Sequence, residues 1–155
     1  MKEKVVVCDV DGCLLDIFKL YKEIAGRQLI NGEMWDFFYK NANNPKYAVK
    51  IKEIFELLNS LDCKIILLTA RRDLIAKPTL HYLLEGEIKL NNISQLIVRS
   101  VDKEGVPSHI FKKEELLKLK EQYDIQFIID DEYTNCATFK EMGFTVLRVL
   151  RNEGG

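Results

Sequence analysis

The chain has 155 residues, of which 47% are hydrophobic and 30% charged, and its formal net charge is -1. This length provides one core and leaves no room for a second catalytic domain. The near-neutral charge excludes the broad basic field that grips long nucleic acids. No stretch approaches the roughly 18 apolar residues of a membrane span, and the amino-terminal apolar run is too short for a signal peptide. We therefore expect a soluble, cytoplasmic protein without membrane association, whose four cysteines are reduced thiols.

The amino-terminal segment places two carboxylates directly after a strand. Val5 to Cys8 form an apolar run that is typical of a strand buried on both faces. Asp9 and Asp11 follow two residues apart, so an extended chain directs both side chains to the same side. Gly12 then permits a tight turn and a close approach of the backbone to a bound group. Because ligands of open α/β sheets collect at the carboxyl ends of strands, we expect a site here.

Residues 16–45 interrupt the pattern of alternating strands and helices, and we expect them to form a small helical cap insertion beside the site. Five aromatic residues lie in this segment: Tyr21, Trp35, Phe37, Phe38 and Tyr39. Several of them must belong to the core. At least one is expected to line the entrance of the site, where it could stack against a base.

Outside this insertion, predicted strands alternate with predicted helices along the sequence. This pattern indicates an α/β fold, a doubly wound Rossmann-like parallel sheet of five strands covered by helices on both faces. The four further strands are expected at 64–69, 94–98, 125–130 and 145–149. The predicted helices cover residues 47–61, residues 112–120 with Leu116, Leu117 and Leu119 toward the core, and residues 134–142 before Gly143. Together these elements predict a single domain over residues 1–155.

A second strand end carries groups that suit an anion. The strand expected at 64–69 ends in Thr69, Ala70 and Arg71, which offer a hydroxyl, turn amides and a guanidinium. Taken alone, such a threonine is more often a turn cap, and such an arginine is more often a surface charge. The sequence therefore indicates an anion site here only in combination with the other strand ends.

A third strand end repeats the acidic pattern of the amino terminus. The apolar strand expected at 125–130 ends in Asp130, and Asp131 follows it directly. Two acidic clusters on neighbouring strands repel each other unless a cation lies between them. A hard divalent cation suits such oxygen ligands. Lys112 and Lys113 precede this strand and provide an ammonium for the same edge, although a lone lysine is more often a solvated charge.

The ordered set DVDG, LLTAR, a lysine and IIDDE resembles the haloacid dehalogenase (HAD) superfamily of aspartate-nucleophile phosphatases. Within that superfamily, the sequence is most similar to the phosphatase domain of phage-type polynucleotide kinase/phosphatase. The features that carry this narrower resemblance are WDFF at 35–38, TARRD at 69–73, LIVRS at 96–100 and FKKEELL at 111–117. No G-x-x-x-x-G-K-[ST] phosphate loop occurs, so no kinase activity is expected.

The resemblance implies a Mg²⁺-dependent phosphate monoester hydrolase that acts on 3′-phosphate ends of polynucleotides through an aspartyl-phosphate. It assigns Asp9 as the nucleophile, and Asp11 as the acid that protonates the leaving oxygen and then as the base that activates water. It also implies that Mg²⁺ is held by Asp9, the main-chain carbonyl of Asp11 and Asp130, with Asp131 bonded in support.

Further roles follow from the same resemblance. Thr69 would hold phosphate oxygens, and Lys113 is the favoured catalytic lysine because leucines follow it at i+3 and i+4, with Lys112 as the competing candidate. The residues expected beside the substrate are Gly12, Ala70, Arg71 and Lys112. Cys13 stands where the superfamily usually has threonine, and a thiol is a weaker hydrogen-bonding group.

Other functions fit parts of the same pattern. A nucleotidase or a small-molecule phosphatase of the same superfamily is the nearest alternative, so the expected substrate is a phosphorylated small molecule or a nucleic-acid end. A phospho-receiver-like domain or another non-catalytic binding protein belongs to a different class. Receiver domains place their phosphorylated aspartate at mid-chain, whereas this chain has its second acidic pair after the lysine. No obligate protein partner is expected.

Overall fold

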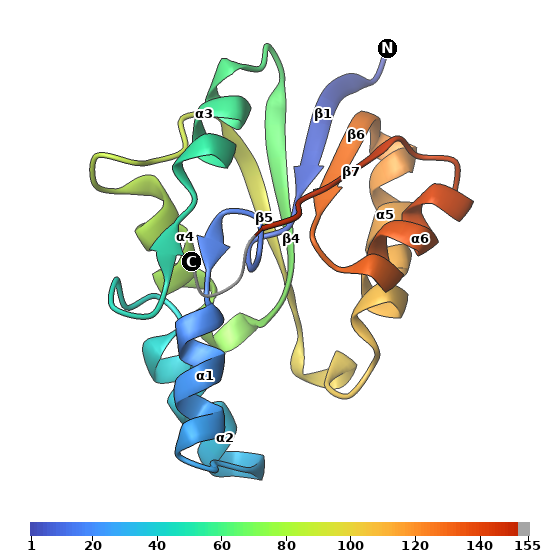
Figure 1. Ribbon diagram of the computed structural model, residues 1–155. Coiled ribbons are helices and arrows are strands. Elements are labelled where there is room, and N and C mark those ends of the chain that lie inside the picture. Colours follow the sequence, from blue (N-terminus) through green and yellow to red (C-terminus); the bar gives the residue numbers. More distant parts are fainter. Residues whose placement is uncertain (152–155) are drawn as a thin grey trace.

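The computed structural model describes residues 1–151, which form an α/β fold around a five-stranded sheet (Figure 1). All strand pairs in this sheet are parallel, in the order β5-β4-β1-β6-β7. The strands are β1 (Glu3–Cys8), β4 (Lys64–Arg72), β5 (Ile93–Arg99), β6 (Tyr123–Asp130) and β7 (Val146–Arg148). The predicted doubly wound parallel sheet is confirmed. Residues 152–155 of the expected domain lie outside the described residues.

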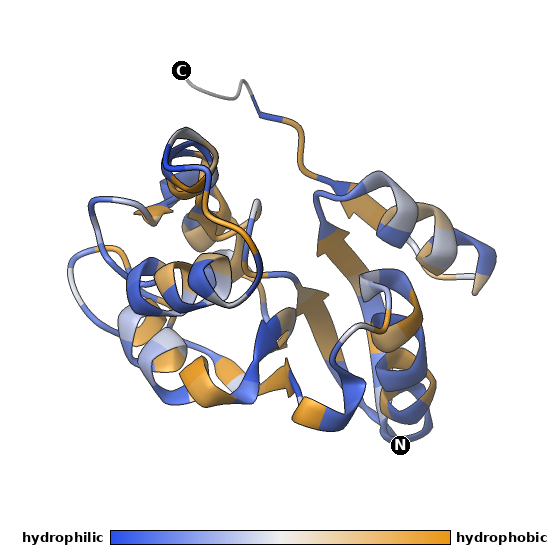
Figure 2. Ribbon diagram, turned by 90° about the horizontal axis from the view of Figure 1, so that it is seen from below, coloured by the Kyte–Doolittle hydropathy of each residue, from blue (hydrophilic) through white to orange (hydrophobic). Residues whose placement is uncertain are grey.

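Strand β1 is the centre of the sheet because it has an apolar side chain for each face. Val5 and Val7 pack into one core, whereas Val6 and Cys8 pack into the other, and all four are at most 1% exposed. This alternation is what an extended chain dictates. The apolar strands accordingly lie between two layers of amphipathic helices (Figure 2).

Helices cover both faces of the sheet. Two of them, α3 (Lys52–Ser60) and α4 (Ala76–Leu84), lie on one face, and α5 (Ser108–Gln122) and α6 (Tyr133–Glu141) lie on the other (Figure 1). Glu132 caps α6 by accepting hydrogen bonds from two backbone amides, and Gly143 with a φ of 93° follows its end. No helix within residues 1–151 is both long and apolar enough to cross a membrane.

The segment expected to form a cap contains two helices, α1 (Phe18–Gly26) and α2 (Asn31–Asn41). We call them the cap helices. They project beyond the carboxyl ends of the strands (Figure 1). A two-stranded antiparallel ribbon of β2 (Leu15–Asp16) and β3 (Val49–Lys50) flanks the cap helices in sequence. The ribbon was not predicted, because strands of two residues are too short to show any periodicity.

Two predicted helices differ from the structure in extent. The helix expected from Tyr47 begins only at Lys52, because the preceding residues form a turn and strand β3. The helix that Lys112 and Lys113 were expected to open begins earlier, at Ser108. Leu117 was expected in the core but is 43% exposed. The buried face of α5 instead follows Lys112, Leu116 and Leu119 at positions i, i+4 and i+7.

The sheet topology explains where the site lies. The chain runs from β1 outward through β4 to β5, and then returns to the other side of β1 for β6 and β7. Open α/β sheets bind ligands at the carboxyl ends of strands beside such a switch point. The ends of β1, β4 and β6 are the three strand ends that carry the polar sequence motifs.

Candidate active site

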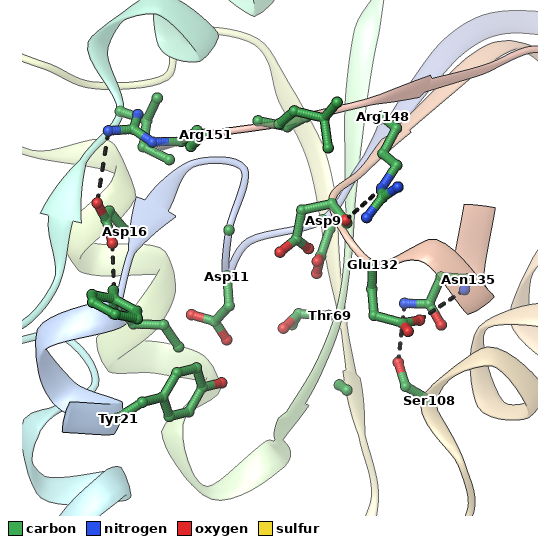
Figure 3. A pocket seen from close by; sticks show the side chains of 18 of the residues that line it. Asp9, Asp11, Asp16, Tyr21, Thr69, Ser108, Glu132, Asn135, Arg148 and Arg151 are labelled. Atoms are coloured by element: carbon green, nitrogen blue, oxygen red, sulfur yellow. Dashed lines mark hydrogen bonds and ion pairs between the residues drawn. The ribbon is translucent and has the colours of Figure 1, made fainter. Parts of the chain in front are cut away.

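A polar cavity of about 450 Å³ opens at the carboxyl ends of β1, β4 and β6. Its lining includes Asp9, Asp11, Thr69, Lys112 and Asp131. The side chains of the first three point toward the same space (Figure 3). Residues separated by more than a hundred positions in the chain therefore share one pocket.

The end of β1 is a rigid turn. The Asp9 amide donates to the carbonyl of Ile129 at 2.9 Å, and the Asp9 carboxylate accepts from the amide of Val10 at 2.8 Å. Gly12 has a φ of 82°, and a Cβ atom there would lie 1.9 Å from an oxygen of Asp131. Glycine is thus required both by the backbone conformation and by the close approach of this carboxylate.

A buried lysine joins the two acidic strand ends. Lys112 is 2% exposed, and its Nζ lies 3.0 Å from Oδ1 of Asp9 and 2.7 Å from Oδ2 of Asp130. Burial acts to lower the pKa of Lys112, but the charges of both carboxylates outweigh it and raise the pKa above its ordinary value. Lys113 was the favoured lysine. It is exposed and lies outside the cavity lining, because it occupies the solvent face of α5, so this expectation is corrected to Lys112.

The carboxylates at the end of β6 have different surroundings. Asp130 is 1% exposed, binds Lys112, and accepts hydrogen bonds from the Glu132 amide at 3.0 Å and the Asn135 amide group at 3.3 Å. Oxygens of Asp131 and Asp9 lie within 4.8 Å of each other and of the Cys13 sulfur. Asp131, which was expected among the metal residues in a supporting position, is therefore the carboxylate that faces Asp9.

The charges around Asp9 and Asp131 are only partly compensated. Burial raises the pKa of Asp9 well above its usual range, Lys112 opposes this, and the neighbouring carboxylates add to the rise. Burial and the charge of Asp130 raise the pKa of Asp131 to about 6. Two facing carboxylates with raised pKa values favour a cation between them, and hard oxygen ligands of this kind fit Mg²⁺.

Cys13 lies beneath this pair of carboxylates and is fully buried. A hydrogen bond with the Cys8 thiol and burial both raise the pKa of the Cys13 thiol far above its ordinary value. The thiol therefore stays neutral. A neutral thiol is a poor ligand for a hard cation, so the donor set that suits Mg²⁺ consists of oxygens.

Arg71 binds a carboxylate of the site. It is 3% exposed, and its Nη2 and Nε lie 2.7 Å from Oδ1 and 3.0 Å from Oδ2 of Asp11. The same guanidinium donates to the side chains of Asn43 at 2.6 Å and Thr79 at 3.0 Å, and to the carbonyl of Ala42 at 2.9 Å. We expected Arg71 to contact a substrate phosphate. That expectation stays a prediction: the donors of Arg71 fix Asp11 against the base of the cap, and Arg71 is absent from the lining of the polar cavity but lines the neighbouring cavity beside the cap helices.

The end of β4 contributes neutral groups. Thr69 is 1% exposed, and its hydroxyl accepts from the Arg71 amide at 3.1 Å. The hydroxyl and Ala70 line the polar cavity opposite the end of β1 (Figure 3). Together they can hold an anion beside Asp9 without adding charge.

The cavity lining includes five polar residues that were not anticipated at the site: Asp16, Ser108, Asn135, Arg148 and Arg151. Asn135 is 2% exposed and donates to Asp130 and to the Ser108 hydroxyl, while its Oδ1 has no hydrogen-bond partner (Figure 3). Its place in the first turn of α6, directly after the acidic motif, is the one sequence signal that could have identified it. Arg148 donates to the Asp131 carbonyl at 3.1 Å from the end of β7.

A second cavity, of about 410 Å³, lies between the cap helices and the end of the sheet. It shares Asp11, Tyr21 and Ala70 with the polar cavity. Four of the five cap aromatics line it: Tyr21, Trp35, Phe38 and Tyr39. Its other charged lining residues are Arg71, Arg72, Arg99 and Glu104. We call it the cap cavity.

Comparison with protein families gives one match. The sequence model of the family described as HAD superfamily, subfamily IIIB (acid phosphatase), matches residues 1–146. That span includes every residue expected at the site. None of the curated protein sequences compared with the chain matches it.

Solved structures share the fold. The Pnkp1/Rnl/Hen1 RNA repair complex includes a chain with a TM-score of 0.70 and 23% identity, covering 96% of this chain and 42% of that one. A class C acid phosphatase from Bacillus anthracis, with tungstate bound, has a TM-score of 0.61 at 15% identity over 87% and 54% of the two chains. A HAD family enzyme from Bacteroides thetaiotaomicron, in complex with magnesium and inorganic phosphate, has a TM-score of 0.62 at 16% identity over 100% and 96%. The chain thus spans less than half the length of the first of these structures.

Proposed function

The chain belongs to subfamily IIIB of the HAD superfamily, the acid phosphatases, and from this premise we propose that it hydrolyses phosphate monoesters through a phosphorylated Asp9. The observation that carries the proposal is the position of the Asp9 carboxylate. It lies at the pocket edge of β1, 3.0 Å from a buried ammonium and opposite a second carboxylate. A carboxylate oriented in this way is suited to covalent catalysis.

In the first step, an Asp9 oxygen attacks phosphorus, and the bond from phosphorus to the leaving oxygen breaks. Asp11 supplies the proton that this oxygen needs. In the second step, Asp11 takes a proton from water, whose oxygen attacks phosphorus and releases Asp9 and inorganic phosphate. Arg71 is a positioning residue here, because its paired contacts fix the orientation of the Asp11 carboxylate.

The remaining site residues compensate charge and hold phosphate. Lys112 balances Asp9 and Asp130 and is the catalytic lysine in this proposal. Thr69 and the amide of Ala70 hold phosphate oxygens at the end of β4.

Mg²⁺ is the cofactor of this superfamily. In this chain the residues that would hold it are Asp9, Asp131 and the main-chain carbonyl of Asp11, while Asp130 supports Lys112. When bound there, the ion supplies positive charge beside the transferring phosphoryl group.

We further propose that the substrates are 3′-phosphate ends of polynucleotides. Two observations support this. The cap cavity adjoins Asp11 and is lined with aromatic rings that suit a base. A structural neighbour of the chain is part of an RNA repair complex. A nucleotidase or a phosphatase of other small esters is the alternative within the same family.

The experiment that tests the proposal compares one oligonucleotide carrying either a 3′-phosphate or a 5′-phosphate, alongside mononucleotides and sugar phosphates, with Mg²⁺ or with EDTA. We expect Mg²⁺-dependent phosphate release with a clear advantage for the 3′-phosphate end. Because the net charge of -1 offers few contacts to a long backbone, short and long oligonucleotides should react alike. A far higher kcat/KM for mononucleotides or sugar phosphates would reject the polynucleotide substrate and leave the phosphatase mechanism intact.

A further inference from the structure

Two arginines lie side by side in the lining of the cap cavity. Arg72 at the end of β4 and Arg99 at the end of β5 are register partners on neighbouring parallel strands. Like charges placed side by side on a sheet repel each other. The fold therefore brings together two guanidinium groups that an anion would stabilise.

The existing partners of these arginines leave that charge incompletely balanced. Arg99 donates to the carbonyls of Ala70, Lys103 and Val106, and binds no carboxylate within residues 1–151. Arg72 contacts Glu104 at 3.1 Å and Asp73 at 3.3 Å, whose side chains are 59% and 49% exposed. These exposed contacts are weak.

A buried donor of the same pair also lacks a partner. Nε of Arg72 is inaccessible to solvent and has no hydrogen-bond acceptor. Such unpaired buried donors are uncommon and unfavourable. The open cavity does not reach this Nε atom, but the planar guanidinium groups of Arg72 and Arg99 carry several further donors, and such groups suit phosphate oxygens.

The cap side of the same cavity is aromatic. Trp35 and Tyr39 stack with their ring centroids 5.8 Å apart and an angle of 21° between the rings. Trp35 is 47% exposed and Tyr21 is 52% exposed. Large rings that remain this accessible beside a cavity offer stacking surfaces for a planar group. The cavity thus combines an aromatic wall with three arginines, Arg71, Arg72 and Arg99, which outnumber the two carboxylates of its lining, Asp11 and Glu104.

We propose that the cap cavity binds the leaving nucleoside, with its base against Trp35 and Tyr39 and its 5′-phosphate at Arg72 and Arg99. This inference rests on the proposed function. Asp11 borders both cavities and protonates the leaving oxygen in that mechanism, so the leaving alcohol must lie on the cap side. A 5′-phosphate monoester on a single nucleotide and a phosphodiester inside an oligonucleotide present the same anion there.

The inference predicts a preference that can be measured on small substrates. A nucleoside 3′,5′-bisphosphate should lose its 3′-phosphate with a kcat/KM at least about tenfold above that of the nucleoside 3′-monophosphate, the effect of roughly one charge-assisted hydrogen bond. Arg72→Gln and Arg99→Gln should each bring this ratio toward one. Lys40→Gln, which removes a charge from an exposed position on α2 outside the cavity, should keep both the ratio and the rate.

A binding measurement keeps the test independent of turnover. Trp35 is the only tryptophan of the chain, so its fluorescence reports on the cap cavity directly. In Asp9→Asn protein, titration followed by this fluorescence should give a Kd for a nucleoside 5′-monophosphate at least about tenfold lower than the Kd for the nucleoside. Adding the Arg72→Gln substitution should make the two Kd values equal.

The outcomes are separable. A ratio near one in the wild type, or a ratio that survives both arginine variants, overturns the assignment of the arginine pair. Equal binding of nucleoside and nucleoside 5′-monophosphate overturns it as well. If no 3′-phosphate is released from any nucleotide or oligonucleotide, the proposed substrate fails. The Trp35 titration then decides alone whether the cap cavity binds a nucleotide.

Discussion

Two aspartate pairs, Asp9 with Asp11 and Asp130 with Asp131, look alike in sequence, and the fold divides them in the same way. Each pair lies at the carboxyl end of a central strand, beside the same pocket. In each, one carboxylate is fixed by a buried basic residue, whereas the other faces its counterpart across the pocket. The facing carboxylates belong to Asp9 and Asp131.

The fixing residues come from distant parts of the chain. Arg71 fixes Asp11 from the end of β4, and Lys112 fixes Asp130 from the second turn of α5. Both basic side chains are at most 3% exposed. Lys112 also reaches Asp9, so the comparison has one asymmetry: the proposed nucleophile touches a buried cation, and Asp131 makes no such ion pair within the described residues. The contacts of Arg71 with Asp11 and of Lys112 with Asp130 therefore distinguish these two aspartates from Asp9 and Asp131, whose carboxylates face each other.

The largest effect is expected from removing the proposed nucleophile. Asp9→Asn leaves no covalent route, so phosphate release should fall by more than about a hundredfold, a rise of at least roughly 2.7 kcal/mol in the barrier. Phosphate release from a 3′-phosphorylated oligonucleotide with Mg²⁺ measures this. A variant that folds normally but keeps more than about one hundredth of the activity would contradict the role of Asp9.

A second test removes Lys112, the buried cation that contacts Asp9 but not Asp131. Lys112→Met leaves two buried carboxylates without their cation, which should lower the free energy of unfolding by about 3–5 kcal/mol and abolish turnover. Lys113→Met is the matched control, because it removes the same charge from an exposed position one residue away. Urea unfolding and phosphate release measure both effects. Equal stability and activity of the two variants would remove Lys112 from the account.

A third test removes the paired hydrogen bonds by which Arg71 orients the Asp11 carboxylate. Arg71→Lys keeps the charge but loses the paired geometry, so Asp11 should protonate leaving groups less effectively. Activated aryl esters need little protonation, and their rate should therefore fall about tenfold less than that of alkyl esters. Arg27→Lys, on the exposed side of the cap, provides the control. Equal losses on both ester classes would indicate a structural role only.

The smallest expected effect is the pH dependence of stabilisation by Mg²⁺, which depends on the facing carboxylates of Asp9 and Asp131. Because the pKa of Asp131 is raised to about 6 in the folded protein, Asp131 opposes folding increasingly as the pH rises from about 4 to above 6. A cation removes this penalty, so Mg²⁺ should raise the Tm more at about pH 7 than at about pH 5, by roughly 3 °C for each kcal/mol. Thermal unfolding with Mg²⁺ or EDTA measures the difference.

The matched variants for this test are Asp131→Asn and Asp36→Asn. The first removes a facing carboxylate and should abolish the pH-dependent response to Mg²⁺. The second removes an exposed charge of the cap and should leave the response in place. If Asp130→Asn abolished the response while Asp131→Asn kept it, the division of the second pair would be reversed.

The sheet and the location of the site were predictable because each depends on local patterns. Apolar runs mark the five strands, and parallel strands bring their carboxyl ends to one edge, so the motifs at Asp9, Thr69 and Asp130 had to meet. The family followed from the order of these motifs. By contrast, the ribbon of β2 and β3 is formed by segments of two residues that carry no pattern.

The choice between neighbouring residues was less predictable. The register of α5 was misread because Leu117 was counted as core, although Lys112, Leu116 and Leu119 share one helix face. The division between Asp130 and Asp131 depends on which of them meets Lys112, a contact between elements that adjacency in sequence does not specify. The partners of Arg71 in the cap are likewise tertiary contacts.

The most direct measurement is to trap the covalent intermediate. Asp11→Asn protein should form the aspartyl-phosphate from an activated ester and then hydrolyse it slowly, because the base for the second step is missing. Reduction with borohydride converts a phosphorylated aspartate to homoserine, and mass spectrometry of the digested protein locates it. The account predicts homoserine at position 9, formed only when substrate is present. Labelling of another residue, or none at Asp9 while phosphate is still being released, would contradict it.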